Sequence, residues 1–423
     1  MRVFGRQFSH NEVMRTFIIS IACGTALLLC ACSDSSTSTG PELLALEIPV
    51  EGHVTAPRLA GDDTGNLVLS WLAPGPGGDA LQFSRLVQDR WSPAATVVDN
   101  VEMFVNWADL ASVVPLGGTR LAAHWLVKRP ENVYSYEIAL AQSTNRGATW
   151  SDPMSPHDDG TPTEHGFVSI FSHADSAGLL WLDGRKTVNK KDTNDLAASG
   201  MTLRAAFVDA EQVLSEQQLV DDLACDCCQT DVAVAASGPI AAYRDRTTEE
   251  IRDIAVTRYV DGAWQPGRRI AADNWEISTC PVNGPSIVAG GQFVAVAWFT
   301  SAETPTVRLS VSSDNGEKFS NPVDVVVGDT LGRVGLAQLD RGDVAVSWLQ
   351  SNGDGTTTVL VRRVARDGSL GPVVTVATKA ALLAVPQIAR FGDDLVFAWT
   401  ETDDTEHRIA SARLPFTALM RVR

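Results

Sequence analysis

Short runs of alternating apolar and polar residues that end in an aromatic residue recur along the whole chain. Successive aromatic residues lie about 50 to 62 positions apart. Each run follows another strand-like piece and a Gly or Asp turn, and most runs precede further strand-like pieces. Alternation with a period of two is typical of half-buried strands. The pattern therefore predicts seven copies of a four-stranded unit, whose aromatic residues are Trp71, Trp125, Trp181, Tyr243, Trp298, Trp348 and Trp399.

Repeats of this length, made of four short strands, predict an all-β chain folded as a β-propeller with one blade per unit. Seven blades are favoured, and six blades with one decorated unit are the alternative, because Tyr243 replaces Trp in the fourth unit. After Trp399 only one more strand is visible, "HRIASARL". We expect an N-terminal strand over residues 42–50 to complete the last blade and close the ring, which leaves no open sheet edge.

The N-terminus predicts secretion. Three arginines precede an apolar run over residues 16–29 that is too short to span a membrane, as in a signal peptide. The following "LCAC" resembles the bacterial lipobox, and this resemblance implies cleavage before Cys32 and lipidation of its thiol. Residues 1–31 are then the signal peptide, 32–41 a flexible tether and 42–423 the propeller. The expected location is the bacterial outer membrane, with the protein lipid-anchored and facing the periplasm or the cell surface.

The charge of the chain restricts its partners. The formal net charge is −17, and it becomes −19 without residues 1–31, which carry three Arg and one Glu. Such an acidic chain argues against nucleic acid and against anionic lipid head groups as partners. We expect membrane contact through the lipid anchor alone, and a monomer.

Most unusual polar residues fall in loops that share one face of the predicted propeller. In a four-stranded blade, the loops entering the first strand and the loops between the second and third strands lie on the same face. Propellers bind ligands at the mouth of their central channel, where such loops gather. The face is therefore predicted to carry function, and its loops are residues 106–109, 157–166, 182–200, 225–231, 244–253, 280–285 and 332–333.

Two of these loops, in "WLDGRK" and "YRDRTTEEIRD", interleave opposite charges. Arginine forks suit a ligand carboxylate because two parallel N–H donors match its two oxygens. Paired carboxylates serve glycoside hydrolysis as proton donor and nucleophile or base. The alternative is an ion-pair network that holds the loops. The candidates for ligand binding are Arg185, Arg244 and Arg246, and those for proton transfer are Asp183, Asp245 and Glu250.

Four cysteines of the predicted mature chain lie in adjacent loops of this face: Cys225, Cys227, Cys228 and Cys280. In a secreted chain they are expected to form disulfides, one of them joining Cys280 to the triplet. Sequence does not choose among the pairings. The alternatives are a thiolate metal site or a redox-active arrangement. No cofactor is favoured, and a divalent metal remains the alternative, with weaker candidate ligands at His157, Asp158 and His165.

Two turns indicate which type of propeller the chain resembles. "SVSSDNGEKF" and "AQSTNRGATW" share the spacing S-x-D/N-x-G-x-x-aromatic, in Ser312, Asp314, Gly316 and Phe319, and in Ser143, Asn145, Gly147 and Trp150. They resemble Asp boxes, the turns between the third and fourth blade strands of sialidase-like propellers. The chain is similar over its mature length to the sialidase and Asp-box superfamily, and especially to bacterial lipoproteins often labelled exo-α-sialidase.

This resemblance implies an arginine triad that holds a substrate carboxylate, with a tyrosine nucleophile, an assisting glutamate and an acid aspartate. Arg58 in "APRLAG" matches the first arginine, although Leu and Ala depart from the family's R-I-P motif. Arg244 and Arg333 lie on the correct face for the other two, and Tyr243 with Glu250 matches the nucleophile pair. Seven repeats instead of six, and the cysteine-rich loops, put sialidase activity in doubt.

The leading hypothesis is an envelope-anchored propeller that binds an anionic glycan containing sialic or uronic acid. Hydrolysis of that carbohydrate or glycoconjugate by an exo-α-sialidase route is left open. The alternatives are a non-catalytic interaction or assembly propeller of the outer membrane, and a metal-handling propeller that uses the Cys and His loops.

Overall fold

The computed structural model describes residues 43–50, 52–62, 64–191, 193, 195–353, 356–403 and 406–420. The chain divides into residues 1–40 and 41–423, and every described residue belongs to the second unit. The predicted signal peptide, the tether and Cys32 lie outside the described residues. No helix within the described part is long and apolar enough to cross a membrane.

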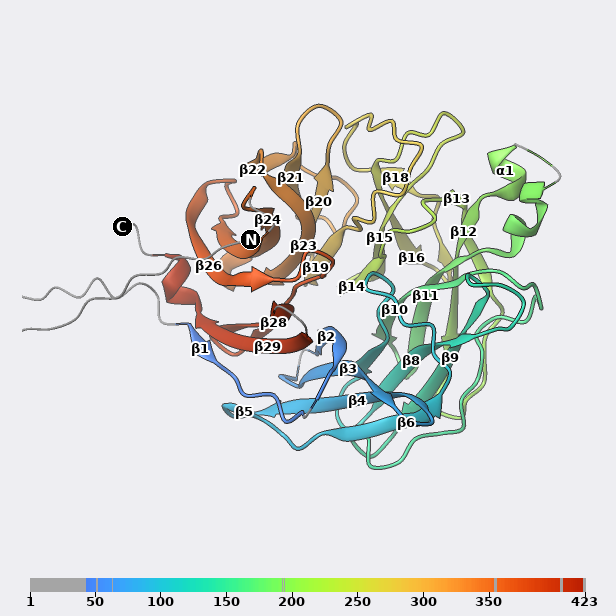
Figure 1. The fold of residues 1–423 in the computed structure, drawn as a ribbon. Coiled ribbons are helices and arrows are strands. Elements are labelled where there is room, and N and C mark those ends of the chain that lie inside the picture. The colour runs from blue at the N-terminus through green and yellow to red at the C-terminus, as the bar shows by residue number, and fades with distance from the viewer. Residues whose placement is uncertain are drawn as a thin grey trace, which may run out of the picture. The chain divides into compact units, whose positions relative to one another are not determined.

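Short antiparallel sheets make up most of the unit (Figure 1). The first sheet contains β2 (Thr55–Gly61), β3 (Leu67–Gly75), β4 (Gly78–Val87), β5 (Arg90–Trp91) and β6 (Ala95–Val101). The second contains β7 (Ser112–Pro115), β8 (Leu121–Lys128) and β9 (Tyr136–Ser143), and the third contains β10 (His165–His173), β11 (Ser176–Asp183), β12 (Met201–Val208) and β13 (Gln218–Ala224).

The sheets of the C-terminal half repeat this order. They contain β14 (Asp231–Ala235), β15 (Gly238–Arg244), β16 (Ile254–Val260), β17 (Ala263–Trp264) and β18 (Arg268–Arg269), then β19 (Ser286–Gly290), β20 (Phe293–Thr300), β21 (Thr306–Ser312) and β22 (Val323–Val327). Two further groups are linked by one bridge between Ala380 and Glu401: β23 (Thr330–Gln338), β24 (Val344–Ser351), β25 (Thr357–Val364) and β26 (Leu370–Ala380), and β27 (Gln387–Phe391), β28 (Asp394–Asp403), β29 (Glu406–Pro415) and β1 (Leu44–Ala45).

Helical structure is limited to short pieces among the described residues. The 3₁₀ segments are η1 (Arg185–Lys191), η2 (Asp340–Gly342) and η3 (Phe416–Leu419), and the α-helix is α1 (Leu196–Ser199). Both η1 and α1 lie in the long loop between β11 and β12.

The first strand of each group contacts the first strand of the next. The order is β2, β7, β10, β14, β19, β23 and β27, and β27 contacts β2 again (Figure 1). Because every sheet is antiparallel and places its first strand against the first strands of its neighbours, the fold is that of a β-propeller.

The repeated aromatic residues form the core between neighbouring sheets. Trp181 packs on β8, Trp298 on β15 and Trp348 on β20. In the same way Trp71 packs against Val396 and Ala398 of β28. Large aromatic side chains bury the most apolar surface, and these four tryptophans are at most 1% exposed. The aromatic residues that the pattern singled out therefore hold each sheet to the one before it.

The N-terminal strand is shorter than expected. The predicted strand over residues 42–50 is reduced to β1, which pairs Leu44 with Arg413 and Ala45 with Ala412 of β29. Beyond β1 the Val50 amide donates to the Ile48 carbonyl, which turns the chain out of the sheet. The side chains of Leu46, Ile48 and Val50 nevertheless pack on the cluster around Trp71.

The second sheet has three named strands where four were expected. Isolated bridges alone continue β9 among the described residues, an antiparallel one between Leu140 and Met154 and a parallel one between Tyr136 and Glu164. Pro153 and Pro156 flank Met154, and proline has no N–H to donate to a ladder. The fourth strand of this unit is therefore reduced to one residue.

The turns at residues 143–150 and 312–319 share one hydrogen-bond pattern. In the first, the Ser143 hydroxyl accepts from the Gly147 amide and the Asn145 side chain accepts from the Thr149 amide. In the second, Ser312 accepts from Gly316 and Asp314 from Lys318. Both glycines have positive φ and pack on the preceding sheet. The two turns thus perform the same packing role at equivalent positions.

Candidate functional site

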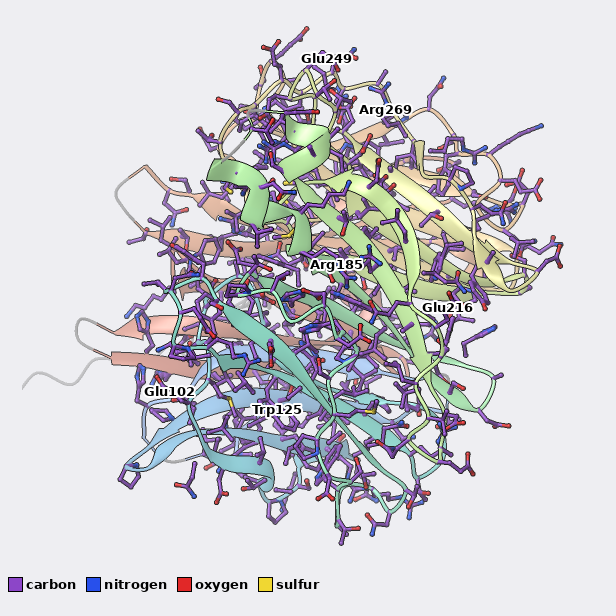
Figure 2. All side chains as sticks on the ribbon, turned by 90° about the vertical axis from the view of Figure 1, so that its right-hand side faces the viewer. Glu102, Trp125, Arg185, Glu216, Glu249 and Arg269 are labelled. Carbon is purple, nitrogen blue, oxygen red and sulfur yellow. The ribbon has the colours of Figure 1, made fainter. Side chains whose placement is uncertain are left out.

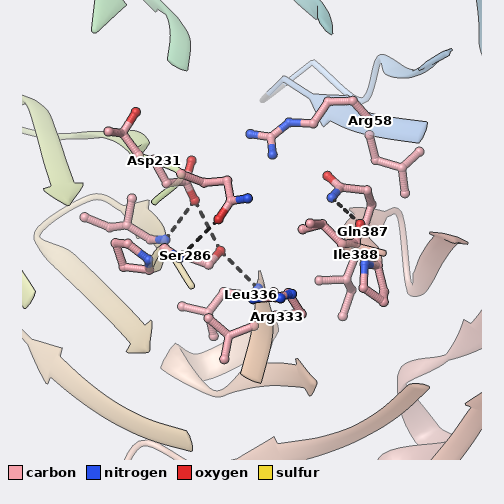
Figure 3. A pocket seen from close by; sticks show the side chains of 17 residues that line it. Arg58, Asp231, Ser286, Arg333, Leu336, Gln387 and Ile388 are labelled. Atoms are coloured by element: carbon pink, nitrogen blue, oxygen red, sulfur yellow. Dashed lines mark hydrogen bonds between the residues drawn. The ribbon is translucent and has the colours of Figure 1, made fainter. Parts of the chain in front are cut away.

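A cavity of about 130 Å³ lies between the first strands (Figure 3). It is small for a ligand site, since such sites usually measure roughly 300 Å³ or more. A carboxylate with part of a sugar ring is the scale of group that it accommodates. The polar or charged side chains in its lining are Arg58, Gln229, Thr230, Asp231, Ser286, Arg333 and Gln387.

Several lining residues occupy the same position of their repeats. Each pairs with the residue directly before the repeated aromatic residue: Arg58 with Ser70, and Asp231 with Ala242. The equivalent positions of the seven units, in chain order, are Arg58, Ser112, Ser169, Asp231, Ser286, Gly335 and Gln387. Six of these seven side chains are polar, so this layer differs from the apolar layers around it.

Hydrogen bonds connect part of this layer (Figure 3). The Asp231 carboxylate accepts from the Ser286 hydroxyl at 3.2 Å and from the Ile287 amide at 2.9 Å. The Ser286 hydroxyl oxygen in turn accepts from the Leu336 amide. Burial raises the pKa of Asp231, and the nearby Arg58 partly offsets that effect. Asp231 is thus a fixed structural acceptor.

Arg58 differs from its neighbours. Its side chain extends from β2 into the cavity (Figure 3), and no hydrogen bond or ion pair joins it to another described residue. It acts on Asp231 and His124 only through its charge. Its guanidinium donors are therefore available to a ligand.

Arg333 also lines the cavity. It has a positive φ of 54° directly after Gly332, where a bulge interrupts β23. Its guanidinium lies 4.7 Å from the ring centre of Trp107 and donates to the Val282 carbonyl, while its Nε has no partner among the described residues. Burial lowers the pKa of Arg333 to about 10.

Arg244 is structural. It is 2% exposed, and its guanidinium donates to the carbonyls of Asn283, Arg252 and Phe299. It also stacks over Trp275 at 4.9 Å. These contacts leave it little capacity to hold a ligand carboxylate.

Arg246 and Glu250 form a bidentate pair, with N–O distances of 2.9 and 2.6 Å. Arg246 also donates to Asp226 at 2.5 Å, and Arg252 donates to Glu250 at 3.0 Å. Burial raises the pKa of Glu250, but the two arginines lower it further, so that it lies below its usual range. Glu250 is held ionised, which suits a counterion more than a proton donor.

The four cysteines converge. Cys225, Cys227 and Cys228 follow β13, and Cys280 precedes β19. The Sγ atoms of Cys225 and Cys228 are 3.1 Å apart, and those of Cys225, Cys227 and Cys228 lie within 4.8 Å of one another. Cys280 lies close enough to Cys227 for each thiol to shift the pKa of the other. The predicted proximity of the loops is present, whereas the predicted disulfides stay a prediction.

A second cluster surrounds Asp159. The rings of His157 and His165 stack at 3.9 Å, and the Asp159 carboxylate is 3.0 Å from Nε2 of His165. Both nitrogens of His165 face oxygen acceptors, Asp159 and the Thr163 carbonyl. Burial lowers the pKa of His165, but the carboxylates outweigh it and raise the pKa overall. Asp159, and not the exposed Asp158, is thus the carboxylate that contacts both imidazoles.

Arg185 joins this cluster and lies close to the short helices in Figure 2. Its guanidinium binds Asp183 at 2.7 and 2.8 Å and lies 3.3 Å from Asp159. Asp183 is fully buried and also accepts from the Trp181 indole. Burial raises the pKa of Asp183, but Arg185 and His165 lower it overall. Neither side chain lines the cavity.

Tyr243 and Asp245 lie apart from the cavity. The Tyr243 hydroxyl donates to Asp221 of β13 at 2.5 Å, and the side chain is fully buried. Burial raises the pKa of Asp245 to about 6. Within the described residues, no hydrogen bond or ion pair joins Asp183, Glu250 or Tyr243 to one another, so the structure does not gather the predicted catalytic groups at one point.

A buried group that the sequence did not single out lies beside the thiol loops. Asp109 accepts from the Phe167 amide at 2.7 Å and from the Tyr136 hydroxyl at 3.2 Å. Burial raises the pKa values of Asp109 and Glu164 to about 7 each. Two neighbouring carboxyl groups thus change charge near neutral pH.

The predicted loops do lie along one rim. Lys190 of η1 is 3.8 Å from Asp226 in the thiol loop, and Asp226 pairs with Arg246 of the loop after β15. Arg252 of that loop donates to Cys225. Figure 2 shows Glu249 at the outer end of the same loop. The rim is shared, but only Arg58 and Arg333 of the predicted residues reach the cavity.

Sequence reasoning missed Asp231, Ser286 and Gln387 as a layer. The signal was present, because the equivalent positions lie 12 or 13 residues before each repeated aromatic residue. Counting back from that residue would have aligned them. Two partners of Arg244, by contrast, are Asn283 and Phe299, which lie 39 and 55 residues away in the chain and leave no such periodic signal.

The fold and the arrangement of its first strands are those of a β-propeller with a charged cavity between these strands. Among solved structures, the chain is similar to the BP39L lectin from Burkholderia pseudomallei, with a TM-score of 0.52, 10% identity, and coverage of 88% of this chain and 95% of the lectin. Weaker similarities include the K499G mutant of NanB sialidase from Streptococcus pneumoniae, with a TM-score of 0.46, 11% identity, and coverage of 91% of this chain and 73% of the sialidase. The phage phi92 endosialidase has a TM-score of 0.48 and 9% identity, with coverage of 89% of this chain and 69% of the endosialidase. No protein-family model and no curated protein matches the sequence.

Proposed function

We propose that the protein is a seven-bladed propeller, closed through β1, that binds the acidic end of a glycan at the channel cavity. The observation that carries this proposal is Arg58, a guanidinium directed into the cavity without a hydrogen-bond partner among the described residues. The cavity lining contains two arginines, Arg58 and Arg333, and one carboxylate, Asp231, a balance that favours an anionic ligand. The cyclic contacts of the first strands support the blade count.

The ligand would be a sialic or uronic acid. A carboxylate matches the donor geometry of the Arg58 fork, while Arg333 and the Gln387 amide offer further polar contacts to ring hydroxyls. The cavity holds only the acidic end, so the rest of the glycan would lie on the rim. A lectin with the same fold is compatible with this mode of binding. The proposal is binding rather than turnover, and it is supported by the positions of Asp183, Asp245, Glu250 and Tyr243, which lie outside the cavity lining.

The test is calorimetric titration with N-acetylneuraminic acid and with glucuronic acid, and with glucose as the neutral reference. The acids are expected to bind and glucose is not. Arg58→Met should weaken acid binding by about 10- to 100-fold, since a hydrogen bond to a charged group contributes about 1.5–3 kcal/mol. Arg90→Met, an exposed arginine of β5 in the same sheet, is the matched control and should bind normally. Failure of both acids to bind, or equal binding by Arg58→Met, would refute the proposal.

Anchoring through Cys32 to the bacterial outer membrane is the second part of the proposal. It rests on the lipobox-like sequence before Cys32. Cells that express the full chain should incorporate labelled fatty acid into the protein and retain it in the outer-membrane fraction. Cys32→Ser should abolish both. A wild-type protein without label would contradict the anchor and leave the proposed ligand site unaffected.

A further inference from the structure

Four arginines surround the thiol cluster, and two of them have carboxylate partners. Arg246 pairs with Glu250 and Asp226, and Arg252 pairs with Glu250 at 3.0 Å and lies 3.8 Å from Asp226. These two cations face two carboxylates, and Lys190, which lies 3.8 Å from Asp226, adds a partly exposed positive charge at the edge of the group.

The other two arginines, Arg244 and Arg333, have no such partner. Among the described residues, no carboxylate lies within ion-pair distance of either guanidinium, and both donate only to backbone carbonyls. Arg244 is 2% exposed. Burying a cation without a counterion costs several kcal/mol, so a negative charge is needed close to these two side chains.

The cysteine sulfurs are the groups in position to supply it. Arg244 lies close enough to Cys225 and Cys228 to interact electrostatically, and Arg333 to Cys227 and Cys228. Nη1 of Arg252 donates to Sγ of Cys225 at 3.4 Å. Two disulfides would be neutral and would leave both arginines without a counterion. Four bare thiolates would carry a charge of −4 against +2.

We propose that Cys225, Cys227, Cys228 and Cys280 bind one divalent thiophilic metal ion, such as Zn²⁺, with Arg244 and Arg333 as counterions. Four thiolates and one divalent cation carry a net charge of −2, which matches the two unpaired arginines. On binding, the metal replaces the four thiol protons, which pass to solvent. Soft thiolate donors favour such ions.

The geometry is compatible with a tetrahedral site. Zn–S bonds of about 2.3 Å place neighbouring sulfurs about 3.8 Å apart. The separation between Cys225 and Cys228 is 3.1 Å, and the three sulfurs of the triplet lie within 4.8 Å of one another. Small side-chain rotations would therefore suffice. The metal would join the loop before β14 to the loop before β19, and so fix two of the strands that line the cavity.

The first experiment measures metal content, thiols and mass on the full chain purified without chelator. We expect one equivalent of zinc per chain, and four cluster thiols that are protected from alkylation in the folded protein and become reactive when a chelator or denaturant releases the metal. Substitution by Co²⁺ should produce the sulfur-to-cobalt charge-transfer absorption of a thiolate site. A mass 2 or 4 Da lower than the reduced chain, with no bound metal, would show disulfides and overturn the proposal. This outcome is independent of sugar binding.

The second experiment uses variants. Cys280→Ser changes the exposed member of the cluster and should reduce bound zinc to well below one equivalent. His165→Gln alters the other group of potential ligands, His157, Asp159 and His165, and is the matched control that should keep one equivalent. Arg333→Gln removes a counterion and should weaken zinc binding, measured against a competing chelator, by at least about tenfold. Unchanged zinc binding in Cys280→Ser and Arg333→Gln would contradict the site and its charge assignment.

Discussion

Replacing Arg244 by methionine is expected to destabilise the protein rather than to remove a ligand contact. Arg244 is the only donor, among the described residues, to the carbonyls of Asn283 and Arg252, neither of which lies in a strand. Methionine fills most of the same volume, so little cavity forms, but the cation–π contact with Trp275 is lost. The variant therefore removes the charged interactions of Arg244, chiefly its hydrogen bonds, without leaving a large void.

The magnitude follows from those bonds. Each buried carbonyl left without a donor costs about 1–3 kcal/mol, so two of them cost about 4 kcal/mol. Removing the buried charge of Arg244 offsets part of this cost only if that charge has no counterion in the folded protein. Unfolding entropy near 60 °C is about 2.1 cal/mol/K per residue, or about 0.8 kcal/mol/K for residues 41–423. A loss of about 4 kcal/mol thus lowers Tm by about 5 °C.

The assay is thermal and urea unfolding followed by tryptophan fluorescence. Arg58→Met is the matched control, because Arg58 has no hydrogen bond to lose, and its Tm should change by less than about 1 °C. A Tm of Arg244→Met equal to that of the wild type would refute the structural role. Loss of acid binding at unchanged Tm would instead return Arg244 to the ligand site that the sialidase resemblance implied.

Three further expectations concern stability. Because the pKa of Asp109 rises from 3.8 to about 7 on folding, the folded state holds this proton more tightly than the unfolded state. Its contribution to stability is therefore present below about pH 4 and lost as the pH rises to about 7. The free energy of unfolding, measured by urea titration, should decline less steeply between these pH values in Asp109→Asn than in the wild type. An identical decline would contradict the pKa shift. Gly147→Ala should destabilise the protein more than Gly65→Ala does. Both glycines have a φ of +83°, but only at Gly147 would a Cβ lie 2.3 Å from Phe83. Equal urea midpoints of the two variants would contradict this expectation. Leu46→Ala should lower the free energy of unfolding by about 2 kcal/mol, because Leu46 is 8% exposed and packs on the cluster around Trp71; a loss below about 0.5 kcal/mol would show that this segment does not hold the last sheet.

The strands were predictable from the sequence because each repeat carries its own signal. Period-two alternation marks the strand, and each repeated aromatic residue lies within a second strand that continues one to four residues beyond it. The positions of Trp71 to Trp399 therefore predict the second strands of the sheets but not where those strands end. Departures occurred where local chemistry overrides that pattern. Prolines beside Met154 remove a ladder strand, and the chain leaves the sheet after β1.

The candidate site was less predictable. The choice of rim followed from strand order, and the loops did meet there. Which charged side chain stays free is decided in part by partners distant in sequence, such as Asn283 for Arg244. Arg58 is free because its neighbours in the layer are short or already bonded. Neither the partners of Arg244 nor the free guanidinium of Arg58 could be predicted from the amino-acid composition.

The position of Arg333 has a consequence for regulation. Its guanidinium belongs to the cavity lining and also interacts electrostatically with Cys227 and Cys228. A ligand that draws this cation toward the channel weakens its attraction to the sulfurs, and a more negative sulfur cluster holds it back from the ligand. Thermodynamic reciprocity requires the same factor in both directions. Under the two proposals above, occupancy of one site would therefore change the affinity of the other through this single side chain.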